Sequence, residues 1–390
     1  MAILNENDFY YLDSSAHGTT PVLEKRVSSF IWVIRDFTED CYYFEFKHGD
    51  AFDVFPIQTL INVSDLDKIK SGKIRLVICN SHESFHYIVD GIYKSLIIRD
   101  GIPPNQITLL SESADILSEV KRISKQYQVE EIKVEWVRLF EADIQIQKMI
   151  LLQQGHRSEG IAHKQYNKKF LNFNRRWRTH RPVLVALLHL NGLLPRGHVS
   201  LGASDDKKNW DNIWNQIHYH HGDNDTIWNT LSKHKQEVQN LPPMHLDISD
   251  LTENQPLLDT NADYLYDETY FSVVTETNFY TRDVPHPARF LSEKTFKPIA
   301  HQHPFIMVSV PKMLEALRGI GYKSFSPWID ESYDNELDDS LRLQKIIDEI
   351  KRLSNLSPPE FTEFVDGIMD ICSHNFKVLM NKKTFIDKLN

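Results

Sequence analysis

The chain has 390 residues, which is too long for one ordinary hydrophobic core and suits two domains. Hydrophobic residues make up 41% and charged residues 25%, a globular composition that excludes a disordered or fibrous protein. The formal net charge of −10 argues against a general nucleic-acid binder or a binder of anionic membranes. The longest apolar run, at 182–194, is too short and too interrupted for a bilayer, so no membrane span is predicted.

The first part of the chain alternates between strand and helix patterns. Short apolar runs predict buried strands at 74–79, 106–110 and 131–140, with helices at 85–99 and 114–128 between them. Such alternation is typical of βαβ units and a parallel sheet. We therefore predict an N-terminal α/β domain over residues 1–155.

Two side chains that can accept a proton, His82 and Glu83, follow the first of these strands. The carboxyl end of a parallel strand is where ligands bind in such sheets. A general base could lie there, with Glu83 as the first choice and His82 as the second. The alternative is structural, because Ser81 or Ser84 could cap the next helix while Glu83 favours its dipole.

A second α/β unit begins after a polar connection near residue 160. Patterns predict a strand at 168–174, a helix at 182–194 and a strand at 198–204. The junction before that helix holds five basic or potentially basic residues: Arg175, Arg176, Arg178, His180 and Arg181. Arginine makes planar, bidentate contacts to phosphate, so we predict a phosphate or acceptor contact here, with Arg175 and Arg181 preferred. A solvated basic loop, or one paired with acidic neighbours, is the alternative.

The stretch from Val273 to Ser309 predicts strand, loop, helix and strand. Glu276 falls at the end of the first strand, and Ser292 can cap a helix over 293–301. A helix N-terminus offers free N–H groups and a positive dipole end to a phosphate, and Lys294 adds a mobile charge. The carboxylate of Glu293 could accept hydrogen bonds from a ribose diol. The alternative is a capped surface helix whose charged side chains are merely solvated.

The string FLSEKTFKPIAHQHPFIMVSVPKMLEALRGIGYKSFSPWIDESYD resembles the donor-binding segment of GT-B glycosyltransferases. Its S/T-E-K helix start, followed by a P-[FV]-[IV] strand, resembles the fucosyltransferase pattern. The fuller string is similar to a glycosyltransferase-like family of large DNA viruses, phages and bacteria. That likeness covers roughly the C-terminal half and extends to LNFNRRWRTHRPVLVALLHLNGLL.

The resemblance implies two Rossmann-like domains facing across a cleft, the GT-B arrangement. Glu293 would then hold the nucleotide ribose and Lys294 would face the diphosphate. From its place at the strand end, and not from the resemblance, Glu276 could contact the donor sugar. The donor domain would cover residues 165–360, and C-terminal helices over 361–390 would return toward the N-terminal domain. The substrates would be a nucleotide sugar and a glycan or other hydroxyl-bearing acceptor.

We therefore predict a metal-independent hexosyl- or deoxyhexosyl-transferase that needs no cofactor beyond its donor. Inversion at the anomeric carbon is the predicted outcome, and a retaining mechanism stays open because the sequence does not place any carboxylate relative to that carbon. The tract HYHHGDND at 218–225 lacks a standard zinc spacing, and no metal site is predicted. Three scattered cysteines favour a reducing compartment and a cytoplasmic location, the host cytoplasm if the chain is viral. Two alternatives stay open: a non-catalytic nucleotide- or carbohydrate-binding protein of the same fold, and a nucleotide-sugar epimerase.

Overall fold

The chain folds into two compact units of the α/β class. The computed structural model describes residues 41–45, 63–80, 87–156, 160–161, 166, 168–203, 209–246, 257–282 and 288–381. Unit 1 comprises residues 1–142, 288–290 and 383–390, and unit 2 comprises 143–287 and 291–382. The division between 142 and 143 falls inside helix α6 (Leu139–Gln153).

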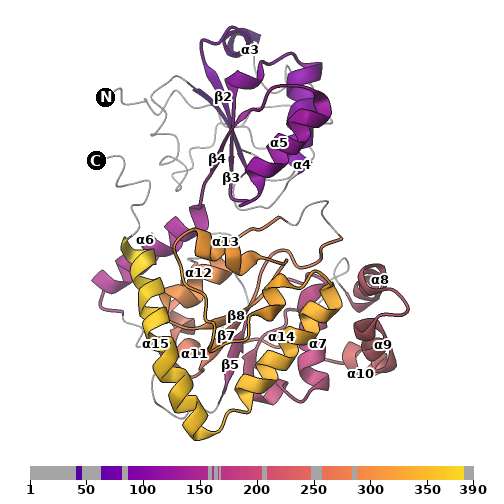
Figure 1. The fold of residues 1–390 in the computed structure, drawn as a ribbon, viewed down its shortest axis with the longest axis vertical. Coiled ribbons are helices and arrows are strands. Elements are labelled where there is room, and N and C mark those ends of the chain that lie inside the picture. The colour runs from indigo at the N-terminus through magenta and orange to yellow at the C-terminus, as the bar shows by residue number, and fades with distance from the viewer. Residues whose placement is uncertain are drawn as a thin grey trace. The chain divides into compact units, whose positions relative to one another are not determined.

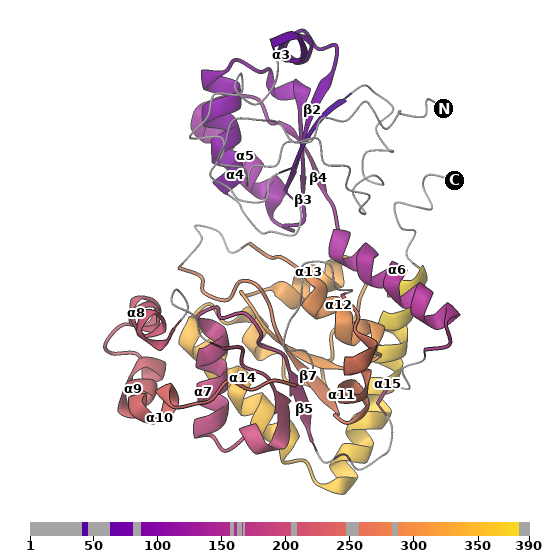
Figure 2. The same ribbon diagram turned by 180° about the vertical axis from the view of Figure 1, so that it is seen from behind.

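Unit 1 is built on a four-stranded parallel sheet whose spatial order, β1-β2-β3-β4, follows the chain. Its strands are β1 (Cys41–Glu45), β2 (Arg75–Asn80), β3 (Ile107–Ser111) and β4 (Lys133–Trp136). Its helices are α3 (Val63–Lys70), α4 (Tyr87–Gly91), the π-helix η2 (Ile92–Arg99) and α5 (Ile116–Tyr127). Helices α4 and α5 cover the same side of the sheet in both ribbon views (Figures 1 and 2). The predicted parallel α/β character of this region is confirmed.

Helix α5 shows why this layer forms. Its apolar residues Ile116, Val120 and Ile123 recur on one face, and all three are buried in the core with the strands. The helix predicted at 85–99 is less regular than expected. A short α-helix is followed by a π-helical stretch that ends where the amide of Asp100 donates to the carbonyl of Ser95 at 2.9 Å.

A tripeptide distant in sequence completes unit 1. The guanidinium of Arg289 binds the carboxylate of Asp115, with Nη2 2.6 Å and Nε 2.9 Å from Oδ1. The backbone amide of Arg289 also donates to Asp115 Oδ2 at 2.9 Å, and Ala114 N–H donates to the Arg289 carbonyl at 2.8 Å. Residues Ala288–Phe290 are therefore part of unit 1 although unit 2 residues precede and follow them.

Unit 2 is built on a second parallel sheet, with strand order β6-β5-β7-β8. Its strands are β5 (Phe170–Asn172), β6 (Gly197–Val199), β7 (Phe271–Thr275) and β8 (Phe305–Val308). The longer helices are α7 (His180–Leu190), α8 (Trp210–His221), α9 (Thr226–Lys233), α12 (Glu293–Ala300), α14 (Asp339–Ser354) and α15 (Pro358–Asn381). The shorter ones are α10 (Lys235–Gln239), α11 (Asp263–Asp267) and α13 (Met313–Gly319).

Helices cover both faces of this second sheet. Helices α7 and α14 lie on one side, and α11, α12 and α15 lie on the other, in both ribbon views (Figures 1 and 2). Strands β7 and β8 are fully buried, as expected for a parallel sheet with two helical layers. The strands predicted at 168–174 and 198–204 exist but pair over only three residues each.

The order of these strands creates a topological switch point. The chain runs from β5 outward to β6 and then returns to the opposite side of β5 to form β7 and β8. In open parallel sheets, ligands bind outside the carboxyl ends of the strands at such a reversal. The segments that follow β5 and β7 are therefore the structural candidates for a site in unit 2.

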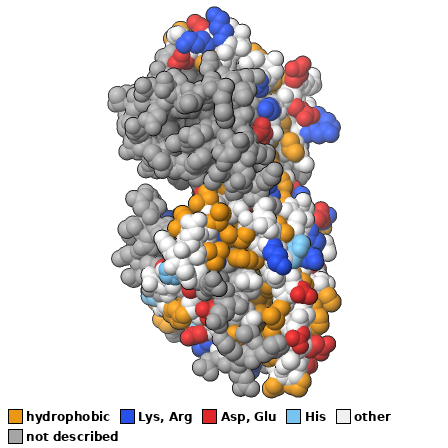
Figure 3. Space-filling view, turned by 90° about the vertical axis from the view of Figure 1, so that its left-hand side faces the viewer, with side chains coloured by type: hydrophobic (Ala, Val, Ile, Leu, Met, Phe, Trp, Pro, Cys, Tyr) orange, Lys and Arg blue, Asp and Glu red, His pale blue; other side chains and the backbone are white. Residues whose placement is uncertain are grey.

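Helix α6 leaves apolar side chains at the surface. Met149, Ile150 and Leu152 are exposed to 45%, 47% and 36%. Figure 3 shows hydrophobic side chains gathered on one face of unit 2. Within the described ranges, no helix combines the length and the apolarity that crossing a membrane would require.

Candidate functional site

Glu276 is the residue on which the end of β7 and the start of α12 converge. It follows β7 directly, and its side chain is fully buried. One carboxylate oxygen accepts hydrogen bonds from the Ser292 amide at 3.1 Å and the Thr295 hydroxyl at 2.5 Å. The other accepts from the Ser292 hydroxyl at 2.6 Å and the Thr277 amide at 3.1 Å. All the donors lie within unit 2, so this carboxylate fixes how α12 leaves the sheet.

The N-terminus of α12 carries three consecutive polar residues. Ser292 is its N-cap, as predicted, and its hydroxyl oxygen accepts from the Lys294 amide at 3.3 Å and the Lys294 ammonium at 2.9 Å. The same ammonium lies 2.9 Å from a carboxylate oxygen of Glu293. Both charged side chains keep some solvent contact, with exposed fractions of 19% for Glu293 and 25% for Lys294.

The charges around Glu293 hold it ionised. Burial alone would raise its pKa, but the charges of Lys294 and Lys297, together with the hydrogen bond from Lys294, outweigh burial and lower the pKa to about 2. The helix start thus has a carboxylate and an ammonium side by side. An incoming anion would compete with the Glu293 carboxylate for Lys294.

The backbone of Glu276 also holds the start of α7. Its carbonyl oxygen accepts from His180 Nε2 at 2.9 Å, which makes Nε2 the protonated nitrogen of that ring. Burial, followed by the charge of Arg181, lowers the pKa of His180 well below its ordinary value, so the ring is neutral at physiological pH. Both α7 and α12 therefore begin in contact with Glu276, the residue that directly follows β7.

Arg181 is a buried cation at this junction. Its exposed fraction is 4%, and its guanidinium donates to three carbonyls: Arg176 at 2.9 Å, Thr275 at 3.4 Å and Glu276 at 3.5 Å. Its Nε is buried without a hydrogen-bond partner among the described residues. Burial, and then the charge of Arg178, lower its pKa to about 10, so it stays charged at neutral pH. A buried charge held mainly by carbonyls favours a nearby anion.

The basic loop between β5 and α7 is anchored at several points. Asn172 and Asn174 hydrogen-bond each other, Thr275 donates to Asn174 Oδ1 at 2.8 Å, and the Asn174 amide donates to the Ser200 hydroxyl at 2.9 Å. Gly202 packs so closely on this loop that a Cβ there would lie 1.8 Å from the Arg175 carbonyl. The packing of Gly202 and these hydrogen bonds therefore hold the loop in place.

The structure brings together most of the residues predicted for the donor side. Ser292, Glu293 and Lys294 meet at the start of α12. Of these three, Ser292 donates to Glu276, whose carbonyl also accepts from Arg181 at 3.5 Å. Arg175 has an exposed side chain at the beginning of the basic loop. The predicted bases, His82 and Glu83, lie outside the described residues.

Several residues of this junction were missed by sequence reasoning. The Thr295 hydroxyl donates one of the four hydrogen bonds that the Glu276 carboxylate accepts. Hydrogen bonds of Asn172, Asn174 and Thr275 connect β5 to β7. Asn at the end of a buried apolar strand was the available signal, because a buried amide must find partners. Gly202 had no local signal at all.

The histidine- and aspartate-bearing tract at 218–225 has structural roles. Asp225 caps α9 by accepting from the amides of Ile227 and Trp228 at 2.7 and 3.0 Å. Asp223 pairs with His218 at 2.8 Å. In the part of the chain that the structure describes, no group of three or more His, Cys, Asp or Glu side chains is arranged to hold a metal ion.

Comparisons with known proteins give little further information. No family model matches the sequence, and no curated protein matches it. Among solved structures, the fold is similar to one described as the crystal structure of a glycosyltransferase from Rickettsia africae ESF-5. The TM-score is 0.42 and the identity 9%, over 95% of this chain and 82% of the other. A similarity of this extent assigns neither a family nor an activity.

Proposed function

We propose that this protein is a glycosyltransferase that moves a sugar from a nucleotide sugar to a hydroxyl group of a glycan or other acceptor. The observation that carries the proposal is the charged junction at the switch point of unit 2. There the buried Arg181 and the α12 start with Lys294 lie on the two sides of Glu276. Positive groups at a switch point suit the phosphates of a nucleotide.

The donor would bind with its diphosphate at the start of α12. Lys294 would exchange its contact with Glu293 for a phosphate oxygen, and the released Glu293 carboxylate would be available to the ribose hydroxyls. The exposed Arg176 and Arg178 lie on the loop that precedes the buried Arg181, and they would be available to further phosphate oxygens. These groups would stabilise the negative charge that develops on the leaving diphosphate, so we propose a transfer that needs no metal.

Glu276 would act as a positioning residue in this scheme. Its carboxylate oxygens already accept four hydrogen bonds from Ser292, Thr295 and Thr277, so it would place α12 and leave proton transfer to another group. We propose Glu83 or His82 as the base that takes the proton of the acceptor hydroxyl. Direct displacement by that hydroxyl would invert the anomeric carbon.

The first experiment measures nucleotide binding by isothermal titration calorimetry with UDP, GDP and CMP on the full chain. We expect one of them to bind, and Lys294→Ala to weaken that binding about tenfold, which corresponds to ~1.4 kcal/mol. Lys351→Ala removes an exposed lysine from the last turn of α14 and serves as the matched control. Absence of binding by all three nucleotides, or equal affinity in Lys294→Ala and wild type, would contradict the proposal.

A second experiment separates transfer from the other functions that such a site allows. Incubation with the corresponding nucleotide sugar should release the free nucleotide (UDP, GDP or CMP) only when a hydroxyl acceptor is present. Conversion of the free donor without acceptor would select an epimerase instead. Binding without any turnover would select a non-catalytic nucleotide-binding protein.

A further inference from the structure

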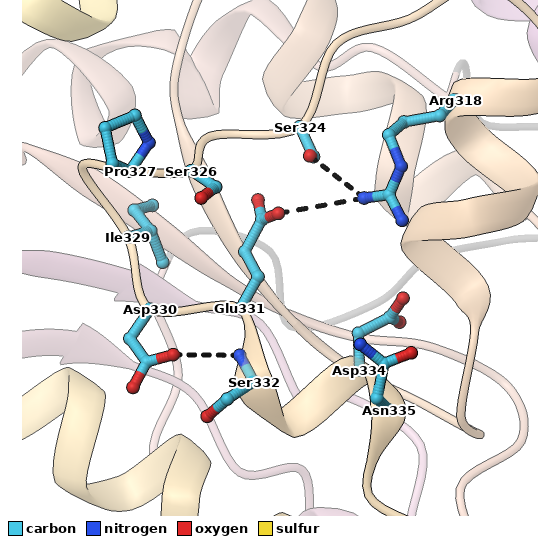
Figure 4. A pocket seen from close by; sticks show the side chains of 10 residues that line it. All are labelled: Arg318, Ser324, Ser326, Pro327, Ile329, Asp330, Glu331, Ser332, Asp334 and Asn335. Atoms are coloured by element: carbon cyan, nitrogen blue, oxygen red, sulfur yellow. Dashed lines mark hydrogen bonds and ion pairs between the residues drawn. The ribbon is translucent and has the colours of Figure 1, made fainter.

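A polar pocket lies in unit 2 between the last turn of α13 and the segment 324–335. Its volume is about 600 Å³, within the range of small-molecule sites. Figure 4 shows its lining, to which Arg318 contributes from α13 and the 3₁₀ helix η6 (Ser332–Asn335) contributes from the opposite side. The pocket shares no lining residue with the α12 start.

The most telling group in this pocket is Asp334. Its exposed fraction is 4%, and its Oδ1 accepts from the Leu314 amide at 3.0 Å, which ties it to the beginning of α13. Its Oδ2 is buried without a hydrogen-bond partner of good geometry among the described residues, although the backbone amides of Met313 and Glu315 also favour the charged carboxylate. A buried carboxylate oxygen without a donor is costly, so this atom favours a ligand that brings a hydroxyl or N–H group.

A second carboxylate, Glu331, lies beside Asp334 with its side chain 11% exposed. One of its oxygens accepts from the Phe325 amide at 2.5 Å, and the other lies 3.7 Å from Arg318 Nη1. The same Arg318 nitrogen donates to the Ser324 hydroxyl at 3.0 Å (Figure 4). Burial raises the pKa of both Glu331 and Asp334, which again favours a donor that compensates for their lost hydration.

The lining selects one class of ligand. It contains three carboxylates (Asp330, Glu331 and Asp334) against one guanidinium, so phosphates and other anions are disfavoured. It also contains the hydroxyls of Ser324, Ser326 and Ser332 and the amide of Asn335. A protonated amine can only donate hydrogen bonds, so the serine hydroxyls, the Asn335 amide and the Arg318 guanidinium would find no acceptor on it. Sugar hydroxyls both donate and accept, so they match the mixed lining.

We propose that this pocket is a binding site for a neutral saccharide, distinct from the nucleotide site proposed above. The hydroxyl groups of the sugar donate to Asp334 Oδ2 and Glu331 and accept from Arg318, while Pro327 and Ile329 offer an apolar surface to a ring face. Binding of a saccharide to this lining would not require the proposed transfer reaction.

The framework of the pocket is well braced. The Asp330 amide donates to Glu349 Oε1 at 2.9 Å, and Arg352 pairs with Glu349 while donating to the Trp328 carbonyl at 2.9 Å. The hydroxyl of Tyr333 accepts from the Met307 amide at 3.2 Å, which attaches η6 to β8. A pocket held in this way is formed before a ligand arrives, which lowers the entropic cost of binding.

The test is saturation-transfer NMR followed by calorimetry on the full chain, without nucleotide. The probes are free mono- and disaccharides of gluco, galacto, manno, fuco and N-acetylamino configuration. We expect at least one to bind, and Asp334→Asn to weaken it at least tenfold. Asp338→Asn is the matched control, because Asp338 also caps a helix, α14, but does not line the pocket.

A second variant protects the test against misfolding. Asn335→Trp starts from an exposed position on η6 and fills the pocket, so it should abolish binding while the thermal midpoint stays near that of the wild type. Failure of every saccharide to bind, or undiminished binding by both Asp334→Asn and Asn335→Trp, overturns the inference. So does tighter binding of spermidine than of any sugar. Because no nucleotide is present, none of these results bears on the nucleotide test.

Discussion

The carboxylate of Glu276 accepts hydrogen bonds from both the hydroxyl and the backbone amide of Ser292, sixteen positions further along the chain. A cap residue usually satisfies the free amides of its own helix. Here the cap is itself held by a buried acid at the end of a strand. The position of the α12 start, and with it Lys294, therefore depends on a side chain that a ligand would not need to touch.

The first prediction concerns this acid. Glu276→Gln keeps the shape but replaces one accepting oxygen with an NH2 group that faces other donors, so we expect the free energy of unfolding to fall by about 2 kcal/mol. Urea titration monitored by fluorescence measures the change, with the exposed Glu363→Gln on α15 as the matched control. A loss below about 0.5 kcal/mol, the range of ordinary surface changes, would show that the carboxylate is not needed to hold α12.

The second prediction tests the packing under the basic loop. Gly202→Ala would place a Cβ 1.8 Å from the Arg175 carbonyl, so the loop must shift. We expect a loss of more than about 2 kcal/mol in the free energy of unfolding, together with weaker nucleotide binding. Gly319→Ala is the control, because nothing lies within 4 Å of its added Cβ, and it should be neutral or slightly stabilising. Equal stability of the two variants would argue against a tight contact.

The third prediction separates stability from binding at Arg181. Burying a charge is unfavourable, so Arg181→Met should change the free energy of unfolding by only about 1 kcal/mol in either direction. The same change should weaken nucleotide affinity about tenfold, because it removes a positive charge from the switch point. Unaltered affinity in a folded variant would remove Arg181 from the proposed site.

The fourth prediction concerns acid stability. His303 is buried between Ser272 and Thr269, and burial lowers its pKa to about 4. In the unfolded chain the pKa of a histidine is near 6.5, so between pH 6.5 and pH 4 the unfolded state binds more protons than the folded state. The free energy of unfolding therefore decreases as the pH falls from about 6.5 toward 4. One such histidine contributes a loss of about 2 kcal/mol between pH 7 and pH 5.

Urea unfolding of wild type and His303→Gln at pH 7 and pH 5 measures this contribution. The variant should lose about 2 kcal/mol less than the wild type between the two pH values, whatever its absolute stability. His374→Gln, which changes a half-buried histidine of α15, should keep the wild-type dependence on pH. An unchanged slope in His303→Gln would mean that His303 titrates normally.

The accuracy of the sequence predictions depended on how local the determining forces were. The strand before Glu276 and the cap at Ser292 were predicted correctly because β-branched periodicity and capping act within a few residues. Strands β5 and β6 proved shorter than predicted because pairing depends on the neighbouring strands. The hydrogen bonds to the Glu276 carboxylate and the need for glycine at position 202 arise from contacts between segments that are distant in the sequence, so no local sequence pattern predicts them.

The pairing of Arg289 with Asp115 limits how this protein can be dissected. A fragment that stopped after Ala142 would contain the first sheet complete but would leave Asp115 facing an empty place where a guanidinium and a backbone amide belong. Only Leu291 separates the unit 1 tripeptide Ala288–Phe290 from Ser292, the N-cap of α12. Recombinant halves divided within α6 should therefore both be defective, and mixing the two should restore the contact between Asp115 and Arg289.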